Sequence, residues 1–210
     1  MTKKVLAPQD WNHINSSLKN NKITMIDNFF TKEVLSILKI RMLYAKYFDH
    51  DYGKDRYQAI DYGKDEDYIT NLIETELQEN IEMLPEFQRA WSFVYNNESI
   101  GTKLHADPSE FNINVWVSDD SVKNSSSNGL CIYEATLPEG MGQDIRYGCF
   151  TEKVEEYVSS LGIEPVKIAY KSNRAVIFNG AYFHRSDNVS MKEGKENKRV
   201  SYTLLFGSRV

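Results

Sequence analysis

Short segments that alternate apolar and polar residues follow one another through the second half of the chain. Each segment is rich in β-branched and aromatic residues and is bounded by glycine, asparagine, serine or aspartate, a pattern typical of strands separated by turns. The segments read AWSFVYN, FNINVWVS, GLCIYEAT, PVKIAYK, RAVIFNG and RVSYTLLFG. One helical segment, TEKVEEYVSSLG, interrupts them. The pattern predicts a strand-rich core over residues 89–210.

The first part of the chain has helical periodicity instead. After a short strand at Ile23–Ile26, Thr31 is a candidate N-cap for a helix whose apolar residues recur near helical spacing. A second amphipathic helix is expected over about residues 65–83. Residues 1–88 are therefore expected to form a mainly helical support region.

The order of these elements predicts a mainly β fold with flanking helices. Helices first and many short strands after them favour a β-sandwich or barrel with helices packed outside. Nothing around residues 84–88 has the composition of a flexible linker. A chain of 210 residues is long enough for one substantial core, so a single domain over residues 1–210 is expected.

The motif DYGKD occurs twice between the two expected helices, at residues 51–55 and 61–65. Two copies are too few for a repeat architecture. Two glycine turns in a surface loop are the first expectation, and a loop that covers a substrate is the alternative.

Composition and charge limit the classes of function. Apolar residues make up 41% of the chain and charged residues 26%, as in ordinary soluble proteins. No apolar run approaches the ~20 residues of a membrane span. No secretory signal is evident, so a cytoplasmic protein without membrane contact is expected, with Cys131 and Cys149 reduced.

The charge is unevenly distributed. Residues 1–50 carry eight Lys/Arg against four Asp/Glu, whereas residues 51–100 carry four against twelve, and the net charge is −5. This distribution argues against a nucleic-acid partner, which would require clustered basic charge. The basic residues of the first quarter are expected to form a solvated face.

Three residues have the chemistry of a metal site. His105 and Asp107 are two apart at the start of an expected strand, so they share one face if the backbone is extended. His184, in NGAYFHRSD, would add a second imidazole from a distant strand. Two imidazoles and one carboxylate on one side of a metal suit non-haem Fe(II). Each motif taken alone has a plainer interpretation. The His–Asp pair would be solvent-exposed, and His184 would be a buried, hydrogen-bonded histidine.

Arg199 and Ser201 form a second pair, fifteen residues beyond His184. A guanidinium binds a carboxylate through two hydrogen bonds, and a nearby hydroxyl can donate a third. A surface ion pair is the alternative, but the apolar residues flanking Arg199 favour a carboxylate clamp, because an unpaired cation among them is unfavourable.

With these motifs, the chain resembles the Fe(II)- and 2-oxoglutarate-dependent dioxygenase superfamily over roughly residues 23–207. The superfamily pattern is His-x-Asp, a distal His and then Arg-x-Ser/Thr; VYNNESIGTKLHAD is also similar to its Tyr…Gly…His-x-Asp run. The resemblance implies a double-stranded β-helix, that is, a cupin-like jelly roll. It also implies that His105, Asp107 and His184 bind Fe(II), and that Arg199 and Ser201 hold the distal carboxylate of 2-oxoglutarate.

Three further residues are candidates for the cosubstrate pocket. Tyr95 matches a position where many members place a tyrosine near 2-oxoglutarate, although a core aromatic is an equal alternative. Asn114 and Tyr133 lie on expected core strands and are further candidates. The inward amide of Asn114 requires a partner, which is either a cosubstrate oxygen or a backbone group.

Two departures from the family pattern bear on the reaction. Residues 185–198, between His184 and Arg199, are longer than is usual and resemble an inserted hairpin loop. An arginine replaces the lysine of collagen-type prolyl hydroxylases, which argues against that reaction. Asp107, where related halogenases have a small residue, argues for oxygen transfer.

The resemblance implies hydroxylation of a substrate C–H bond with dioxygen, releasing succinate and CO₂. A small-molecule or amino-acid-like substrate is expected. The rival interpretations are a non-catalytic or isomerase-type cupin-like metal-binding protein and a zinc hydrolase. The first has no need of a carboxylate clamp, and the second lacks a candidate activating glutamate near the motif.

Overall fold

The computed structural model describes residues 4–20, 23–53, 57–62, 67–124, 128–137 and 152–208. The elements in chain order are α1 (Trp11–Asn20), β1 (Ile23–Ile26), α2 (Lys32–Leu43), β2 (His50–Asp51), β3 (Tyr57–Tyr62), α3 (Tyr68–Asn80), β4 (Phe87–Tyr95), β5 (Glu98–Ser99), β6 (Phe111–Trp116), η1 (Asp120–Val122), β7 (Leu130–Tyr133), α5 (Glu152–Ser160), β8 (Val166–Ile168), β9 (Ala175–Asn179), β10 (Phe183–Ser186), β11 (Val189–Ser190), η2 (Lys195–Asn197) and β12 (Val200–Phe206).

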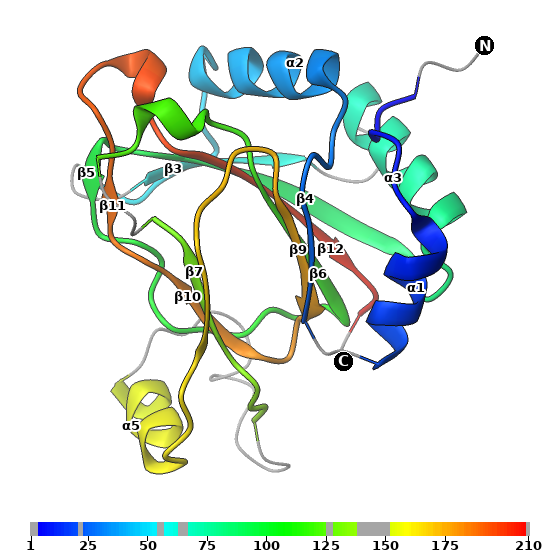
Figure 1. Cartoon of the computed structure of the whole chain (residues 1–210). Coiled ribbons are helices and arrows are strands. Elements are labelled where there is room, and N and C mark those ends of the chain that lie inside the picture. The colour runs from blue at the N-terminus through cyan, green and yellow to red at the C-terminus, as the bar shows by residue number, and fades with distance from the viewer. Residues whose placement is uncertain are drawn as a thin grey trace.

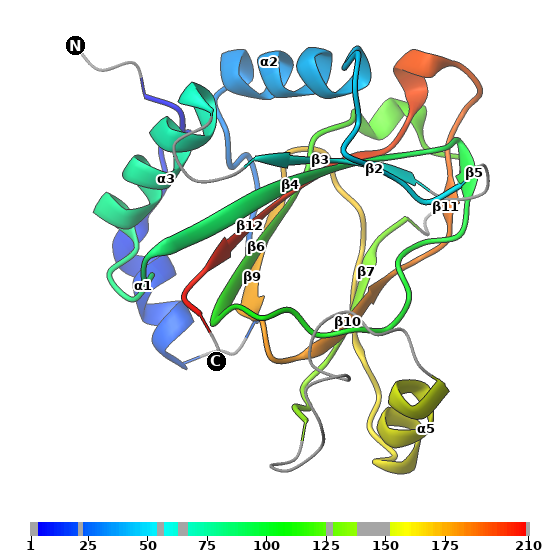
Figure 2. The same ribbon diagram turned by 180° about the vertical axis from the view of Figure 1, so that it is seen from behind.

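Two antiparallel sheets face each other (Figure 1). The larger sheet has seven strands in the order β1-β9-β6-β12-β4-β3-β2, and the smaller has three in the order β10-β7-β8. Helices α1, α2 and α3 lie along the outer face of the larger sheet, as Figures 1 and 2 show from opposite sides. The arrangement confirms the expected mainly β fold with flanking helices.

Strand β12 shows why the larger sheet has two different faces. Tyr202 and Leu204 belong to the core that the sheet shares with the helices. Ser201 and Thr203 alternate with them and therefore face the smaller sheet, where both line a cavity. One strand thus contributes to the hydrophobic core on one side and to a polar pocket on the other.

Most elements predicted from periodicity are confirmed. Thr31 accepts a hydrogen bond from the backbone N–H of Val34 and caps α2. The second expected helix is α3, shorter than predicted, with Asp67 as its N-cap. Helix α1 was not predicted from the sequence. None of the described helices is long and apolar enough to cross a membrane.

The segment between α2 and α3 was wrongly expected to be only a surface loop. Tyr57–Tyr62 forms β3, which pairs with β4 along its whole length and with β2 at its other edge. Parts of both DYGKD copies, residues 54–55 and 63–65, lie outside the described residues. Residues 1–88 also supply strands β1, β2 and β3 of the larger sheet. This region therefore contributes more to the sheet than a mainly helical support region would.

The long interval between His184 and Arg199 is not a hairpin paired with itself. Its strand β11 pairs with β5, through Val189 with Ser99 and Ser190 with Glu98. Met191 forms a further bridge with Lys123. The interval is therefore held against two distant segments of the chain.

A charged cluster joins β1 to the segment preceding β9. Arg174 Nε donates to Asp27 at 2.6 Å, and Lys171 Nζ donates to it at 2.7 Å. Hydrogen bonding from Arg174 is the main influence on the pKa of Asp27; it outweighs the opposing effect of burial and, with Lys171, lowers this pKa to about 2. Folding therefore favours the ionised carboxylate.

Asp27→Asn is expected to lower the free energy of unfolding at neutral pH by about 1 kcal/mol, because the Asp27 side chain is 36% exposed and solvent screens its pairing. The folded-state pKa of about 2 lies below the ordinary 3.8, so this contribution is complete above pH 3.8 and is lost as the pH falls toward 2. Urea unfolding at several pH values between neutral and about 3 measures the difference between the two proteins. A difference that does not shrink toward low pH would contradict the prediction, and Glu155→Gln, at an exposed pair, serves as the control.

Candidate metal centre and adjoining cavity

His105 and Asp107 lie in the segment between β5 and β6, whereas His184 lies on β10. The expectation that the His–Asp pair stands at the start of a strand is wrong, because the next strand, β6, begins only at Phe111. Instead His105 pairs with His184 as an isolated antiparallel bridge. The His105 N–H donates to the His184 carbonyl at 3.0 Å, and the His184 N–H donates to the His105 carbonyl at 2.8 Å. This backbone pairing brings the two imidazoles together.

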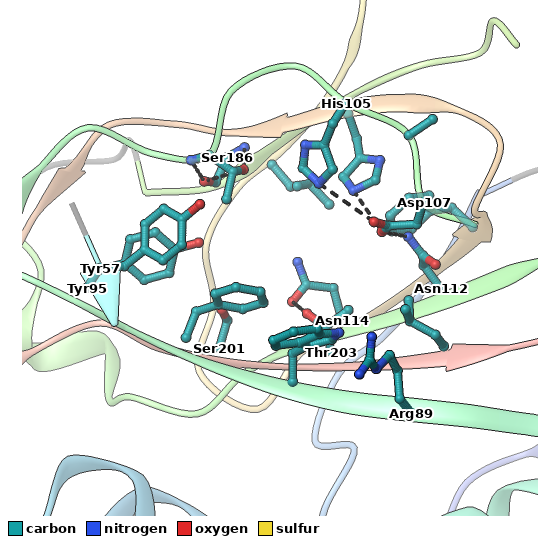
Figure 3. A pocket seen from close by; sticks show the side chains of 18 of the residues that line it. Tyr57, Arg89, Tyr95, His105, Asp107, Asn112, Asn114, Ser186, Ser201 and Thr203 are labelled. Carbon is teal, nitrogen blue, oxygen red and sulfur yellow. Dashed lines mark hydrogen bonds and ion pairs between the residues drawn. The ribbon is translucent and has the colours of Figure 1, made fainter. Parts of the chain in front are cut away.

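The three side chains converge on one point, and Figure 3 shows His105 and Asp107 there. Asp107 Oδ2 lies 3.3 Å from His184 Nε2, and Asp107 Oδ1 lies 3.8 Å from His105 Nε2. One potential ligand atom from each residue lies within 4.8 Å of the others. The predicted grouping of two imidazoles and one carboxylate is therefore present, and its N₂O donor set fits an Fe(II) ion that keeps open positions.

Backbone carbonyls select the tautomer of both histidines. His105 Nδ1 lies 2.6 Å from the Lys103 carbonyl, and His184 Nδ1 lies 2.9 Å from the Tyr182 carbonyl. Because a carbonyl oxygen only accepts, each Nδ1 must carry the proton and donate it. The neutral form then has its lone pair on Nε2, the atom directed at Asp107, as a metal ligand requires.

The electrostatics of the cluster favour the metal-binding protonation states. Burial, reinforced by the neighbouring His184, lowers the pKa of His105 to about 4. Burial alone would raise the pKa of Asp107, but its interactions with His184, His105 and the Asn112 amide lower it to about 2. At neutral pH the site therefore offers a neutral His105 and an ionised Asp107.

Asn112 is a supporting residue that the sequence analysis missed. It is fully buried on β6, and its Nδ2 donates to Asp107 Oδ2 at 2.5 Å. Its Oδ1 accepts from the Ser109 hydroxyl, which fixes the orientation of the amide. Asn112 thus holds the carboxylate toward the two histidines. The sequence could have indicated Asn112 as a pocket residue, because it lies two residues from Asn114 and therefore on the same face of the strand.

Arg199 is fully buried just before β12. Its Nε and Nη1 have no hydrogen-bond partner among the described residues. Its Cζ lies 4.4 Å from the centroid of the Tyr95 ring, a cation–π contact, and no carboxylate in the described part of the chain pairs with it. A buried guanidinium in this state is unfavourable unless an anion binds it.

One cavity of about 370 Å³ joins the triad to Arg199. Of the residues predicted for the cosubstrate, Arg199, Ser201, Tyr95 and Asn114 all line it. Asn114 accepts a hydrogen bond from Thr203 at 3.3 Å, so its inward amide has a protein partner.

Tyr133 does not line this cavity. Its ring packs beside Val154 and Phe183, in the smaller core that includes α5. Side chains alternate along β7, and Leu130 is the residue of that strand that reaches the cavity. Tyr133, three residues further, therefore has the opposite orientation.

Several aromatic residues of the cavity wall were not predicted. Trp91 and Phe93 precede Tyr95 at alternate positions on β4, and Tyr57 reaches the cavity from β3. Tyr57 lies beside Tyr95, with 4.9 Å between ring centroids (Figure 3). The alternation in AWSFVY was a usable signal for Trp91 and Phe93. No sequence pattern indicated Tyr57, because its strand was not predicted.

No family model matches the chain, and no curated protein matches it either. Solved structures do. A prolyl-4-hydroxylase from Pseudomonas putida is 11% identical, with a TM-score of 0.62 over 95% of this chain and 100% of that one. The epimerase SnoN from nogalamycin biosynthesis, in complex with Fe³⁺, alpha ketoglutarate and nogalamycin RO, is 11% identical, with a TM-score of 0.67 over 94% and 83%. HygX from Streptomyces hygroscopicus, with nickel, 2-oxoglutarate and hygromycin B bound, is 11% identical, with a TM-score of 0.58 over 95% and 86%.

These likenesses establish the fold. The chain has the jelly roll of the 2-oxoglutarate–Fe(II) oxygenases, which confirms the predicted fold class. The predicted His-Asp-His grouping stands within that fold.

Asn112→Ala is expected to lower the affinity for Mn²⁺, used as a divalent probe, about 10- to 100-fold, because Asp107 loses the amide that orients it. Isothermal titration calorimetry measures the affinity. The matched control is Asn114→Ala, on the same face of β6 but bonded to Thr203, and its affinity should stay within about twofold of the wild type. Equal losses in the two variants would contradict the positioning role.

Proposed function

We propose that this chain is an Fe(II)- and 2-oxoglutarate-dependent oxygenase that hydroxylates a C–H bond of a small-molecule or amino-acid-like substrate, with release of succinate and CO₂. His105, Asp107 and His184 would hold the metal. The observation that carries the proposal is the buried Arg199 cation, which has no anionic partner among the described residues and lines the same cavity as the triad. We place the protein in the cytoplasm, where the buried Cys131 thiol stays reduced.

The charge at Arg199 defines the kind of cosubstrate. A 2-oxoglutarate dianion has one carboxylate beside its keto group, for the metal, and a distal carboxylate for the guanidinium. Burial of Arg199 makes this pairing strong, because water does not compete for the N–H donors. Ser201, two residues further on the same face, lines the cavity beside Arg199 and would add a hydroxyl donor.

Each group has a separate part in the reaction. The bound iron and 2-oxoglutarate would supply dioxygen activation, coupled to oxidative decarboxylation of the cosubstrate. The protein supplies ligand geometry through the triad, orientation through Arg199 and Ser201, and exclusion of water through apolar walls such as Phe178 and Leu130. No side-chain general base is required.

Oxygen transfer is favoured over halogenation and over the cupin-like alternatives. Asp107 fills the carboxylate position, and both of its oxygens lie within 4 Å of a histidine Nε2, which supports an intact three-residue site. A cupin-like isomerase or non-catalytic binding protein would have no use for an unpaired buried arginine in the same cavity. The arginine clamp also argues against collagen-type prolyl hydroxylation.

The first test is anaerobic titration with Fe(II) and 2-oxoglutarate, watched for the weak visible charge-transfer band of the metal–cosubstrate chelate. The wild type should develop the band and His105→Ala should not, because the variant lacks one ligand. A wild type without the band would contradict the cosubstrate assignment. Succinate release during aerobic incubation with candidate metabolites then reports turnover.

Arg199→Met is expected to separate binding from folding. Without ligand, the variant should be more stable than the wild type by about 1 to 4 kcal/mol, because an unpaired buried charge is replaced by an apolar side chain. With Mn²⁺ present, 2-oxoglutarate should raise the melting temperature of the wild type but not of Arg199→Met. The same ligand-induced shift in both proteins would exclude Arg199 as the clamp.

A further inference from the structure

A second arginine, Arg89 on β4, lines the same cavity. Arg89 and Tyr95 are six residues apart on one strand, or about 20 Å, and Tyr95 is the residue that contacts Arg199. Figure 3 shows Arg89 on the side of Asp107 and Asn112, away from Tyr57 and Tyr95. The cavity therefore has one cation at each end of β4.

The two arginines differ in accessibility. Arg199 is fully buried, whereas the Arg89 side chain is 45% exposed, so Arg89 marks the side of the cavity that faces solvent. A molecule held by Arg199 and the triad lies toward the inner end. The outer end is left for a second molecule, with Arg89 at its rim.

Arg89 is held in a fixed orientation by two contacts. Its guanidinium lies 4.7 Å from the centroid of the Trp91 ring, and its Nη2 donates to Asp61 Oδ2 at 2.5 Å. An ordinary surface ion pair would contribute little, but here the guanidinium also lies over the Trp91 ring in the cavity wall. The single hydrogen bond to Asp61 leaves other N–H donors of the guanidinium available to a ligand.

The surface next to Arg89 is apolar and partly uncovered. Trp91 is only half-buried and stacks on Phe93, with 6.2 Å between centroids and an interplanar angle of 18°. Leu205 pairs with Arg89 across the sheet and also lines the cavity. A ligand whose anionic group meets Arg89 would therefore rest its apolar part on Trp91 and Leu205.

We propose that Arg89 is the specificity-determining residue of a substrate subsite for small carboxylic acids with an apolar or aromatic body. This inference rests on the proposed function and names the class of substrate for it. The substrate carboxylate binds Arg89 at the rim, and the apolar body lies on Trp91 beneath the triad. Asp61 pairs with the guanidinium when no substrate is bound, and the substrate carboxylate competes with it for the N–H donors. The volume of about 370 Å³, shared with the cosubstrate, restricts the subsite to small molecules.

The test compares acids with their own amides. The probes are 3-phenylpropanoate, N-acetylphenylalanine and N-acetylleucine, each beside its primary amide, titrated calorimetrically into protein loaded with Mn²⁺ and 2-oxoglutarate. The wild type should bind at least one acid about tenfold more tightly than its amide, because only the acid forms charge-assisted hydrogen bonds. Arg89→Gln should abolish this preference and leave the affinity for the amide unchanged.

Two further variants make the comparison specific. Lys19→Gln removes an exposed, paired cation on α1, away from the cavity, and should behave as the wild type. Asp61→Asn keeps Arg89 and removes the competing carboxylate, so the acid preference should persist or increase. Thermal unfolding of each variant verifies that the fold is intact.

The outcomes separate this inference from the proposed function. Affinity for 2-oxoglutarate should be the same in Arg89→Gln and the wild type, because Arg199 is intact. If the wild type does not bind 2-oxoglutarate, the proposed function fails, and the acid–amide comparison is read from the protein without cosubstrate. The subsite is overturned if no acid is preferred, if no probe binds, or if the preference survives in Arg89→Gln.

Discussion

The pair of backbone hydrogen bonds between His105 and His184 is the interaction on which the site depends. The segment that carries His105 and Asp107 belongs to no strand of either sheet, whereas His184 lies on the smaller sheet. Two mutual hydrogen bonds, and one from the Asp107 N–H to the Gly180 carbonyl at 2.9 Å, hold the three residues together. The geometry of the triad is therefore set by main-chain pairing, which is more rigid than any arrangement of side chains on free loops.

The two faces of the larger sheet have different roles: one packs against the helices and stabilises the fold, and the other lines the cavity. The face toward α1, α2 and α3 is packed with apolar side chains, and its burial supplies the hydrophobic stabilisation of the fold. The opposite face carries Arg199, a buried cation without a described partner, which opposes folding until a ligand binds. A site of this kind departs from the rule that buried charges are paired, and such departures are expected where a protein binds its substrates.

The triad and the pair of Arg199 with Ser201 were predictable from the sequence because their residue types are chemically specific and their i, i+2 spacing is local. Asn112, Tyr57 and Arg89 were not predicted, because their roles depend on which residues lie opposite them in the sheet. Tyr133 shows the sensitivity of such predictions: a shift of one position along a strand moves a side chain to the other face. Its strand was predicted correctly, but the phase of its alternation was not.

The amino-acid sequence by itself determined the mainly β fold, the donor set of His105, Asp107 and His184, and the pairing of Arg199 with Ser201 on one face. These follow from periodicity and side-chain chemistry, which act over a few residues. Only the tertiary structure decided that β3 joins the larger sheet, that Arg199 is buried with no described carboxylate beside it, and that Arg89 shares its cavity. The physical reason is that strand order and register arise from contacts between segments far apart in the chain, and no local pattern encodes which strand a segment will meet.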